Sequence, residues 1–450
     1  MKIIKLENQK NDSFFEAECF LHIGEAKEDK NYVAFDLRRE DDPLYSCSYY
    51  DFEKEKGDKI FHCFDGQDYS WKCYENEVTN DEKLKNEILG NYDILRNSTI
   101  RYLKEIIHKN KVDFSKKIIE ETGSDPFMGY IDISFGLSLN DSLWIVPEEK
   151  AYLNWEEANL YKNPFSERLQ MVSFGLGYEG NSPYKISPEF TTNGMLKKCW
   201  IRENDKIFLL KSNSETGFDF TSKHVEVFFE YYTSQIAKIF KPNSITYDIV
   251  EFNGEFCSKC QIFTTENRGY LPITAFLTEE ELKKGEKILA DRSYFIEKAV
   301  SIYGKENFED LMLFDAIIGN RDRHLGNFGM IVNNKTFEVL NVAPIFDNGE
   351  SILNYYNFNK NLEFGAYSSR TNSLGQRFNE VFKNYVQQRH ENFFKKLKTF
   401  RFERHPEYNL SENILVSFER HSHSMSERAL KIIENRSKTN KNQGKSKRTL

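Results

Sequence analysis

The chain has 450 residues, of which 39% are hydrophobic and 29% charged, and its net charge is −8. This composition excludes a wholly disordered chain, and the length predicts two or three domains at roughly 150 residues each. No run approaches the ~18 apolar residues of a membrane span, and the start lacks an apolar stretch of signal-peptide length. Seven cysteines without regular spacing favour a reducing compartment, so we expect a cytoplasmic protein with no membrane attachment.

The first part of the chain is acidic. Residues 1–90 hold 22 Asp or Glu against 13 Lys or Arg, a net charge of −9. Up to about residue 80, short aromatic runs separated by charged turns indicate strands, and the apolar spacing over 81–122 indicates helix. We therefore expect an acidic α+β region over residues 1–125, of unknown role.

The middle of the chain predicts two hairpins with a helix between them. "KCWIRENDKIFLLKS" (198–212) has a polar turn at its centre, and "KHVEVFFEYYTSQIAKIF" (223–240) has helical periodicity. "ITYDIVEFNGEFCSKCQIFTT" (245–265) turns at Asn253-Gly254, a strong hairpin signal. After about residue 278 helices dominate.

These elements predict a bilobal α+β fold with a small sheet-rich lobe followed by a larger helical lobe, which is one way to build a nucleotide cleft. The expected parts are the N-terminal region 1–125, an N-lobe 126–265, a helical C-lobe 266–436 and a disordered basic tail 437–450.

The polar stretch "GNRDRHLGNFG" (319–329) follows an apolar helical run. Two extended runs come next, and we expect them to form a hairpin that ends at Asp347. Asp322, Asn327 and Asp347 should then lie near one another. Two carboxylates and a carboxamide are hard oxygen ligands, which suit Mg²⁺.

The spacing of these residues is that of a phosphoryl-transfer site. In protein kinases a base Asp precedes a metal-binding Asn by five residues, and a second metal-binding Asp follows. Asp322 therefore fits the base, and Asn327 and Asp347 fit the metal ligands. The kinase catalytic-loop His precedes the Asp, whereas His324 follows it, so we expect His324 to be a hydrogen-bonding residue of the loop.

The upstream half should hold the nucleotide. The loop "FTTNGMLKK" contains Gly194, and its backbone amides fit a phosphate cover. Lys211, on the following strand, has the place of the phosphate-contacting lysine of kinases. Glu226 in the next helix is the expected partner of Lys211, with Glu230, one turn later, as the second candidate.

The sequence resembles the HipA-like kinases, an atypical bacterial Ser/Thr kinase family, over roughly residues 130–435. "GNRDRHLGN" and "APIFDNGES" match the family's signature, and "FTTNGMLKKCW", "FLLKS" and "HVEVFFEYYTSQIA" match its N-lobe more loosely. The resemblance implies a bilobal, protein-kinase-like fold and a kinase that uses ATP and Mg²⁺. It implies Asp322 as catalytic base, Asn327 and Asp347 as metal ligands, and Lys211 as the phosphate contact.

The resemblance also implies the rest of the nucleotide site. Gly194 would lie in the phosphate loop, and a hinge near "CQIF", with Gln261 and Phe263, would hold adenine through its backbone. Family members often autophosphorylate a Ser of the phosphate loop. This chain has Thr191 and Thr192 there, so autophosphorylation at either is a hypothesis.

The sequence predicts transfer to a Ser or Thr hydroxyl of a protein, and the family suggests the toxin of a toxin–antitoxin system. The partner would then be an antitoxin-like or regulatory protein, and nucleic acid would be met only through that partner or the basic tail. Two alternatives are a phosphoinositide-type lipid kinase, whose "DRHxxN" loop is close to this one, and a pseudokinase or binding module that acts through the N-terminal region.

Several other polar residues could have either a functional or a structural role. Arg321 and Arg323 flank the expected base and either bind substrate or phosphate or form salt bridges. Cys257 and Cys260 form a CxxC, but no second pair stands at zinc-site spacing, so we expect thiols of the second hairpin. Asp322, taken alone, could also be an ordinary turn residue.

Overall fold

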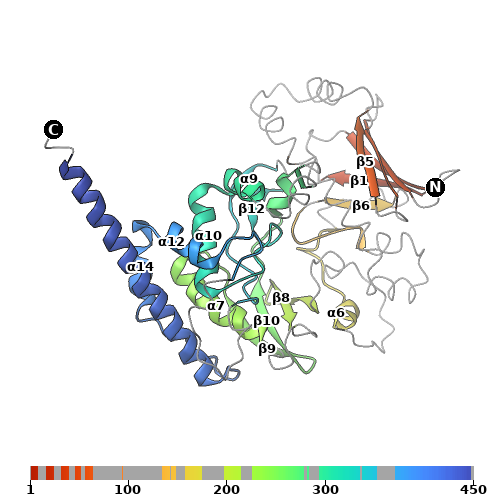
Figure 1. Ribbon diagram of the computed structural model, residues 1–450. Coiled ribbons are helices and arrows are strands. Elements are labelled where there is room, and N and C mark those ends of the chain that lie inside the picture. The colour runs from red at the N-terminus through yellow and green to blue at the C-terminus, as the bar shows by residue number, and fades with distance from the viewer. Residues whose placement is uncertain are drawn as a thin grey trace. The chain divides into compact units, whose positions relative to one another are not determined.

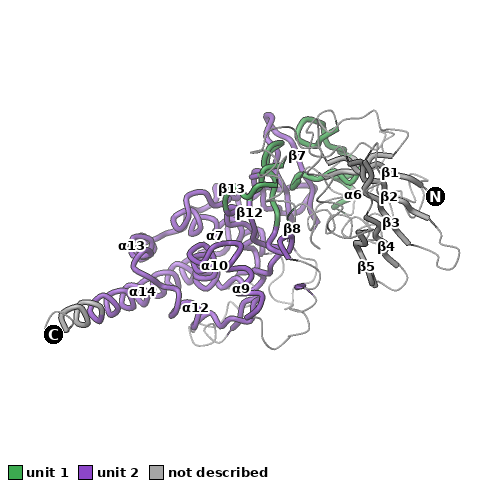
Figure 2. Tube along the Cα trace, turned by 90° about the horizontal axis from the view of Figure 1, so that it is seen from above, with its two compact units in different colours: residues 1–194, 264–271, 331–341 green, residues 195–263, 272–330, 342–450 purple. Residues whose placement is uncertain are grey.

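The computed structural model divides into two compact units (Figure 2). Unit 1 comprises Met1–Gly194, Thr264–Leu271 and Ile331–Asn341, and unit 2 comprises Met195–Phe263, Pro272–Met330 and Val342–Leu450. The structure describes the backbone of strands β1–β5 and, further along, residues 94, 134–141, 143–147, 158–174, 197–213, 225–277, 281–282, 293–334, 337–351 and 370–446. The domain boundaries expected from the sequence stay a prediction.

Unit 1 contains a six-stranded antiparallel sheet of order β5-β4-β3-β2-β1-β6. Its strands are β1 (Lys2–Asn8), β2 (Ala17–Gly24), β3 (Tyr32–Arg39), β4 (Ser46–Asp51), β5 (Lys56–Cys63) and β6 (Leu143–Pro147), and the unit also holds the short helix α6 (Glu167–Ser173). The first five strands confirm the sheet predicted before residue 80. The helix expected over 81–122 lies outside the described residues, except for residue 94.

Unit 2 begins with a four-stranded antiparallel sheet of order β7-β8-β10-β9. Its strands are β7 (Lys198–Glu203), β8 (Lys206–Ser212), β9 (Tyr247–Phe252) and β10 (Glu255–Gln261). The two hairpins turn at Asn204-Asp205 and at Asn253-Gly254, and all four turn residues have φ between 47° and 80°. Asn, Asp and Gly tolerate this left-handed conformation, which matches the twist of the strands. Both predicted hairpins are confirmed.

Helix α7 (Glu226–Phe240) packs against β9 and β10 (Figure 1). It buries an apolar face that includes Phe229, Tyr232 and Ile236, and it stops before Pro242, which cannot donate a backbone hydrogen bond. This arrangement confirms the helix predicted between the hairpins. It also places the carboxylates of α7 on the side of the helix that faces the sheet.

A third sheet has three strands in the order β11-β12-β13, and most of its residues belong to unit 1. Its strands are β11 (Arg268–Pro272), β12 (Gly329–Asn333) and β13 (Val339–Val342), and the 3-10 helix η3 (Ile273–Phe276) follows β11. The Asn333 N–H donates to Glu338 O at 2.9 Å, and the Ala343 N–H donates to Gly329 O at 2.9 Å. The hairpin predicted after the polar stretch is therefore present.

The rest of unit 2 is mostly helical (Figure 1). It contains α9 (Ser293–Tyr303), α10 (Lys305–Ile318), α12 (Phe378–Tyr385), η5 (Gln388–His390), α13 (Glu391–Leu397) and α14 (Glu412–Ser446). Helix α10 is buried from Phe308 to Ile318 and packs against α12, α14 and α7, so it forms the centre of the core. Helix α14 continues past residue 436, where we expected a disordered tail to begin. The fold is mixed α+β, with small antiparallel sheets.

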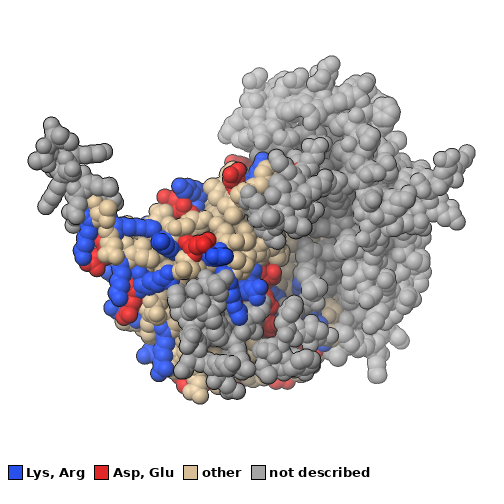
Figure 3. Space-filling model, in the orientation of Figure 1, with Lys and Arg blue, Asp and Glu red and all other residues tan. Residues whose placement is uncertain are grey.

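Lys and Arg side chains gather over the C-terminal helices on the face shown in Figure 3. Several of them are paired within one helix, as Lys395 is with Glu391 at 2.7 Å and Lys438 is with Glu434 at 2.5 Å. Such pairs at a spacing of four residues belong to a solvated helix surface. Among the helices that the structure describes, none is long and apolar enough to cross a membrane.

Candidate active site

The site loop begins where α10 ends. Gly319 has φ 72°, and its N–H donates to Asp315 O at 2.7 Å, so a glycine in the left-handed conformation closes the helix. The chain then turns away through Asn320, which is fully buried, to Asp322, which is exposed. The end of a buried, rigid helix therefore fixes the start of the polar stretch.

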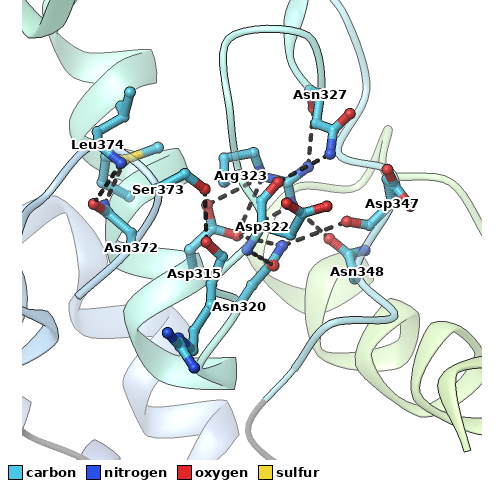
Figure 4. Close-up of polar contacts among 12 residues, drawn as sticks. Asp315, Asn320, Asp322, Arg323, Asn327, Asp347, Asn348, Asn372, Ser373 and Leu374 are labelled. Atoms are coloured by element: carbon cyan, nitrogen blue, oxygen red, sulfur yellow. Dashed lines mark hydrogen bonds and ion pairs between the residues drawn. The ribbon is translucent and has the colours of Figure 1, made fainter. Parts of the chain in front are cut away.

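Arg323 is fully buried and joins the loop to the segment that follows β13 (Figure 4). Its Nε donates to Asp315 Oδ2 at 3.1 Å, and its Nη2 donates to Asp315 Oδ1 at 3.1 Å. Its Nη1 donates to Asn327 O at 3.0 Å and to Phe346 O at 2.5 Å, and its Nη2 reaches Asn348 Oδ1 at 2.7 Å. Of the two readings of Arg323, the structure supports the salt bridge, because the guanidinium is enclosed by protein.

Asn320 and Asn327 bring the three expected site residues together. The Asp322 N–H donates to Asn320 Oδ1 at 3.0 Å, and Asn327 Nδ2 donates to Asp322 O at 2.9 Å. Asn320 Nδ2 also donates to Asp347 O at 3.4 Å. Figure 4 shows Asp322, Asn327 and Asp347 in one cluster, with Arg323 behind them. Since the amide group of Asn327 is used within the loop, its Oδ1 is the atom that suits a cation.

Lys211, on β8, carries the positive charge of the site. Its Nζ forms an ion pair with Asp347 Oδ1 and lies 3.5 Å from Glu230 Oε1. The second oxygen of Glu230 accepts the Asn348 N–H at 3.0 Å, and the Glu230 side chain is only 2% exposed. Strand β8, helix α7 and the segment after β13 therefore meet at this lysine.

Glu230, and not Glu226, supplies the α7 carboxylate that pairs with Lys211, which corrects our first candidate. Glu226 lies one turn earlier, in the first turn of α7. Its Cβ lies against Gly349, where an added Cβ would come within 3.3 Å of it. The carboxylates of Glu226 and Glu230 are one helical turn apart, which is ~5.4 Å along the axis of α7. They therefore lie at different positions along strand β8, which carries Lys211.

The charges of the site are coupled. Burial opposes ionisation of Asp347, but the Lys211 ammonium and, more weakly, Arg323 outweigh it and lower the pKa of Asp347 to about 2. Burial acts to lower the pKa of Lys211, yet Asp347 and Glu230 raise it above its ordinary value. Burial raises the pKa of Glu230, against the attraction of Lys211. Asp347 and Lys211 are therefore a charged pair over the physiological range.

Asp322 differs from Asp347 in its surroundings. Desolvation by the loop raises the pKa of Asp322, the His324 imidazole opposes this, and the Asp347 charge adds to it. Among the described residues no side chain donates a hydrogen bond to the Asp322 carboxylate, so its oxygens can accept a proton from a bound hydroxyl. Two neighbouring carboxylates thus have pKa values that are shifted in opposite directions, a common feature of catalytic sites.

The expected nucleotide residues are only partly described. Gly194 lies outside the described residues, as do Thr191 and Thr192. Gln261 and Phe263 flank Ile262, whose N–H donates to Ile207 O of β8 at 3.0 Å. Because backbone groups alternate along a strand, those of Gln261 and Phe263 face away from β8.

The remaining candidates have local roles. His324 is exposed, and its Nδ1 accepts the Gly326 N–H at 3.0 Å, which is a loop hydrogen bond. Arg321 is exposed, and its carbonyl accepts the Ser373 hydroxyl at 2.6 Å. Cys257 and Cys260 lie on β10, as expected for hairpin thiols. In the described part of the chain, no three His, Cys, Asp or Glu side chains gather as a metal site of their own.

Sequence reasoning missed the buried supports of the site, namely Asn320, the hub role of Arg323, and Tyr247, whose hydroxyl accepts the Asp347 N–H at 3.1 Å. One signal was available for Arg323. Asp315 is the only charged residue of the run Leu311–Ile318 in α10, and a buried carboxylate requires a cation. Nothing local marks Tyr247, which is a hundred residues away from Asp347.

Comparison with known proteins gives remote similarities. No protein-family model matches the chain. No curated protein matches it either. Among solved structures, it is similar to the proinflammatory kinase CtkA of Helicobacter pylori, with 16% identity and a TM-score of 0.37 over 54% of this chain and 90% of that one.

It is also similar to a chain of the Shewanella oneidensis MR-1 toxin–antitoxin complex of HipA, HipB and operator DNA. The identity is 13% and the TM-score 0.40, over 71% of this chain and 82% of that one. At these values the likeness assigns no activity, which depends on the side chains of the site. The second of these structures contains HipA, and the sequence resembles the HipA-like kinases.

Proposed function

We propose that this chain is an ATP- and Mg²⁺-dependent protein kinase that transfers the γ-phosphoryl group to a Ser or Thr hydroxyl. One observation carries the proposal. Asp322, Asn327 and Asp347 form one cluster with a lysine that is paired with a buried glutamate of α7. Phosphoryl transfer requires these groups, which are a base, oxygen ligands for a metal and a cation for phosphates.

The residues of the cluster fit a magnesium nucleotide. The Asp347 carboxylate and Asn327 Oδ1 are the oxygen donors that would hold Mg²⁺, which usually keeps waters and substrate phosphates as its other ligands. Bound ATP would supply the phosphoryl group, and Mg²⁺ would offset the negative charge of the phosphates.

Asp322 has the role of base. Its exposed carboxylate orients the acceptor hydroxyl and receives the proton as the hydroxyl attacks. Buried Asn320 accepts its backbone N–H, and buried Arg323 fixes the loop around it, so the carboxylate is supported by groups that do not themselves touch substrate. This support limits the reorganisation that the loop needs before reaction.

Lys211 has the role of phosphate contact. It pairs with Asp347 here, and its 3.5 Å contact with Glu230 provides a second anchor from which it can reach phosphate oxygens. The backbone of Gln261 and Phe263, at the end of β10, is proposed to hold adenine. Gly194 is proposed to lie in the phosphate loop.

Further parts of the proposal come from the sequence and from the family resemblance. They are a bilobal arrangement of an N-lobe (126–265) and a C-lobe (266–436), a cytoplasmic location, and a role as the toxin of a toxin–antitoxin pair. The partner would be an antitoxin-like or regulatory protein. Autophosphorylation at Thr191 or Thr192 also belongs to this group, and phosphosite mapping after incubation with ATP would decide it.

Calorimetric titration with a non-hydrolysable ATP analogue, with and without Mg²⁺, tests the site. The chain should bind the analogue more tightly with Mg²⁺. Asp347→Asn should reduce this metal-dependent gain by roughly ten- to a hundredfold, as the loss of one metal contact does. Asp205→Asn, the same chemical change in an exposed turn, is the control. An equal gain in Asp347→Asn and the unsubstituted chain would remove Asp347 from the metal site.

A further inference from the structure

The backbone of Asp347 has an unusual conformation. Its φ is 56°, in the left-handed region, which aspartate enters more readily than most residues with a side chain but still at a cost in free energy. Such a conformation persists only when surrounding groups hold it. It also sets the direction of the Asp347 carboxylate, which is a proposed metal ligand.

Three side chains hold the backbone groups on both sides of this residue. The Asp347 N–H donates to the Tyr247 hydroxyl at 3.1 Å, and the Asp347 carbonyl accepts from Asn320 Nδ2 at 3.4 Å. The next amide, the Asn348 N–H, donates to Glu230 Oε2 at 3.0 Å. These contacts come from β9, from the loop after α10 and from α7, so three elements fix one strained residue.

Among these three side chains, Tyr247 is the one whose described hydrogen bonding in the site is to Asp347 alone. Glu230 also pairs with Lys211, and Asn320 also bonds Asp315. The Tyr247 hydroxyl stands at the end of β9, and its oxygen accepts the Asp347 amide directly. Burial raises the pKa of Tyr247 well above its usual range, so the hydroxyl stays neutral near the paired Lys211 and Asp347.

We propose that Tyr247 is a positioning residue, whose hydroxyl holds Asp347 in the left-handed conformation that aims its carboxylate at the metal. The inference rests on the proposed function. Tyr247 touches neither nucleotide nor acceptor in this scheme and acts through Asp347. Removal of its oxygen should leave the fold intact and weaken the metal contact, because the strained conformation loses one of its three supports.

The test uses the full chain with Tyr247→Phe, which deletes one oxygen atom. Tyr232→Phe is the matched control, since Tyr232 is another buried tyrosine of unit 2, and its hydroxyl contacts Asn409 Oδ1 at 2.5 Å on the other side of α7. Mg²⁺ is titrated into each protein after saturation with a non-hydrolysable ATP analogue. Binding of the analogue without metal and hydrogen–deuterium exchange of the segment 345–349 are measured in parallel.

We expect Tyr247→Phe to weaken Mg²⁺ binding roughly tenfold, the effect of one lost hydrogen bond. Binding of the analogue without metal should not change, and exchange of the segment 345–349 should accelerate. Tyr232→Phe should match the unsubstituted chain in all three measurements. Thermal unfolding of the two variants, measured alongside, excludes a general loss of fold.

The possible results distinguish a failure of the positioning role of Tyr247 from a failure of the proposed kinase function. Unchanged Mg²⁺ binding in Tyr247→Phe, with a normal metal response in the unsubstituted chain, would overturn the positioning role and leave the kinase proposal standing. Absence of a metal response in the unsubstituted chain would overturn both. Faster exchange together with unchanged metal binding would show that Tyr247 holds the segment without aiming the carboxylate, which also overturns the inference.

Discussion

At the scale of single residues, Arg323 is the structural centre of the site. It is a charge with no exposed surface, and it bonds a carboxylate of α10, two backbone carbonyls and an amide oxygen. A buried charge is tolerated only when its donors are satisfied, and the five guanidinium N–H groups match this set of acceptors. Arg323 therefore fixes the loop that carries Asp322 to the segment that carries Asp347.

Replacement of Arg323 should be costly. Arg323→Met leaves the Asp315 carboxylate buried without its cation, and removal of one partner of a buried pair typically costs about 3–5 kcal/mol. Urea unfolding should show a loss of that size. Arg321→Met, a change in an exposed neighbour, should alter the free energy of unfolding by no more than about 0.5 kcal/mol. Equal stability of the two variants would show that Arg323 is not the hub that its contacts indicate.

Spacing predicted the site residues better than it predicted their supports. The five-residue spacing from Asp322 to Asn327 and the hairpin before Asp347 are local features, and the structure brings the three residues together. The partner of Lys211 depends on how α7 is positioned over β8, which is a tertiary property. The sequence therefore offers both Glu226 and Glu230 as the partner of Lys211, and the structure shows that Glu230 forms the ion pair.

At the scale of elements, the end of α10 is held by a side chain of α14. The Nε2 of His421 lies 3.0 Å from Ile317 O, a carbonyl of the last turn of α10. Carbonyls in the last turn of a helix lack partners within the helix and need donors from elsewhere. The imidazole therefore joins the C-terminal helix to the helix from which the site loop departs.

This contact should make stability depend on pH. Burial lowers the pKa of His421 from 6.5 to about 4, so between these values the unfolded chain binds a proton that the folded chain does not. The contribution of His421 to the free energy of unfolding is fully present above pH ~6.5. It decreases by about 2 kcal/mol as the pH is lowered to ~4, after allowance for the partial exposure of the residue.

Urea unfolding from pH 7 to 4.5 provides the measurement. His421→Gln keeps an N–H donor for Ile317 O but cannot gain a proton, so its stability should fall less over this range. The difference between the two proteins cancels the other titrating groups, which both share. Parallel stability curves would show that His421 remains able to protonate in the folded chain.

Elements with local signals were predicted best. Asn253-Gly254 and the polar turn at 203–206 both form the left-handed turns that their residues favour. The extent of α14 was underestimated, because the basic composition after residue 436 was read as a disordered tail. The helix continues to Ser446 although residues 437–446 include Thr, Asn and Gly, which favour helix weakly, and no proline interrupts the segment.

At the scale of the whole molecule, the site is assembled from distant parts of the chain. Lys211 and Asp347 are 136 positions apart, and Tyr247 and Asp347 are 100 apart. Unit 2 is itself built from three separate stretches of sequence. Contacts over such separations follow from tertiary packing, for which a single sequence has no pattern, so the supports of the site could be seen only in the structure.

The central claim is that this assembled cluster transfers phosphoryl groups with Asp322 as the base. The most direct test is the rate of ADP formation from ATP and Mg²⁺, with water, the chain's own hydroxyls and added Ser/Thr peptides as acceptors. We predict ADP formation by the unsubstituted chain and by the exposed-turn control Asp205→Asn. Asp322→Asn should be slower by about 10²–10⁴-fold, the usual contribution of general base catalysis, and should still bind the analogue with Mg²⁺. Equal rates in Asp322→Asn and the unsubstituted chain, or no ADP formation by any of the three proteins, would contradict the claim.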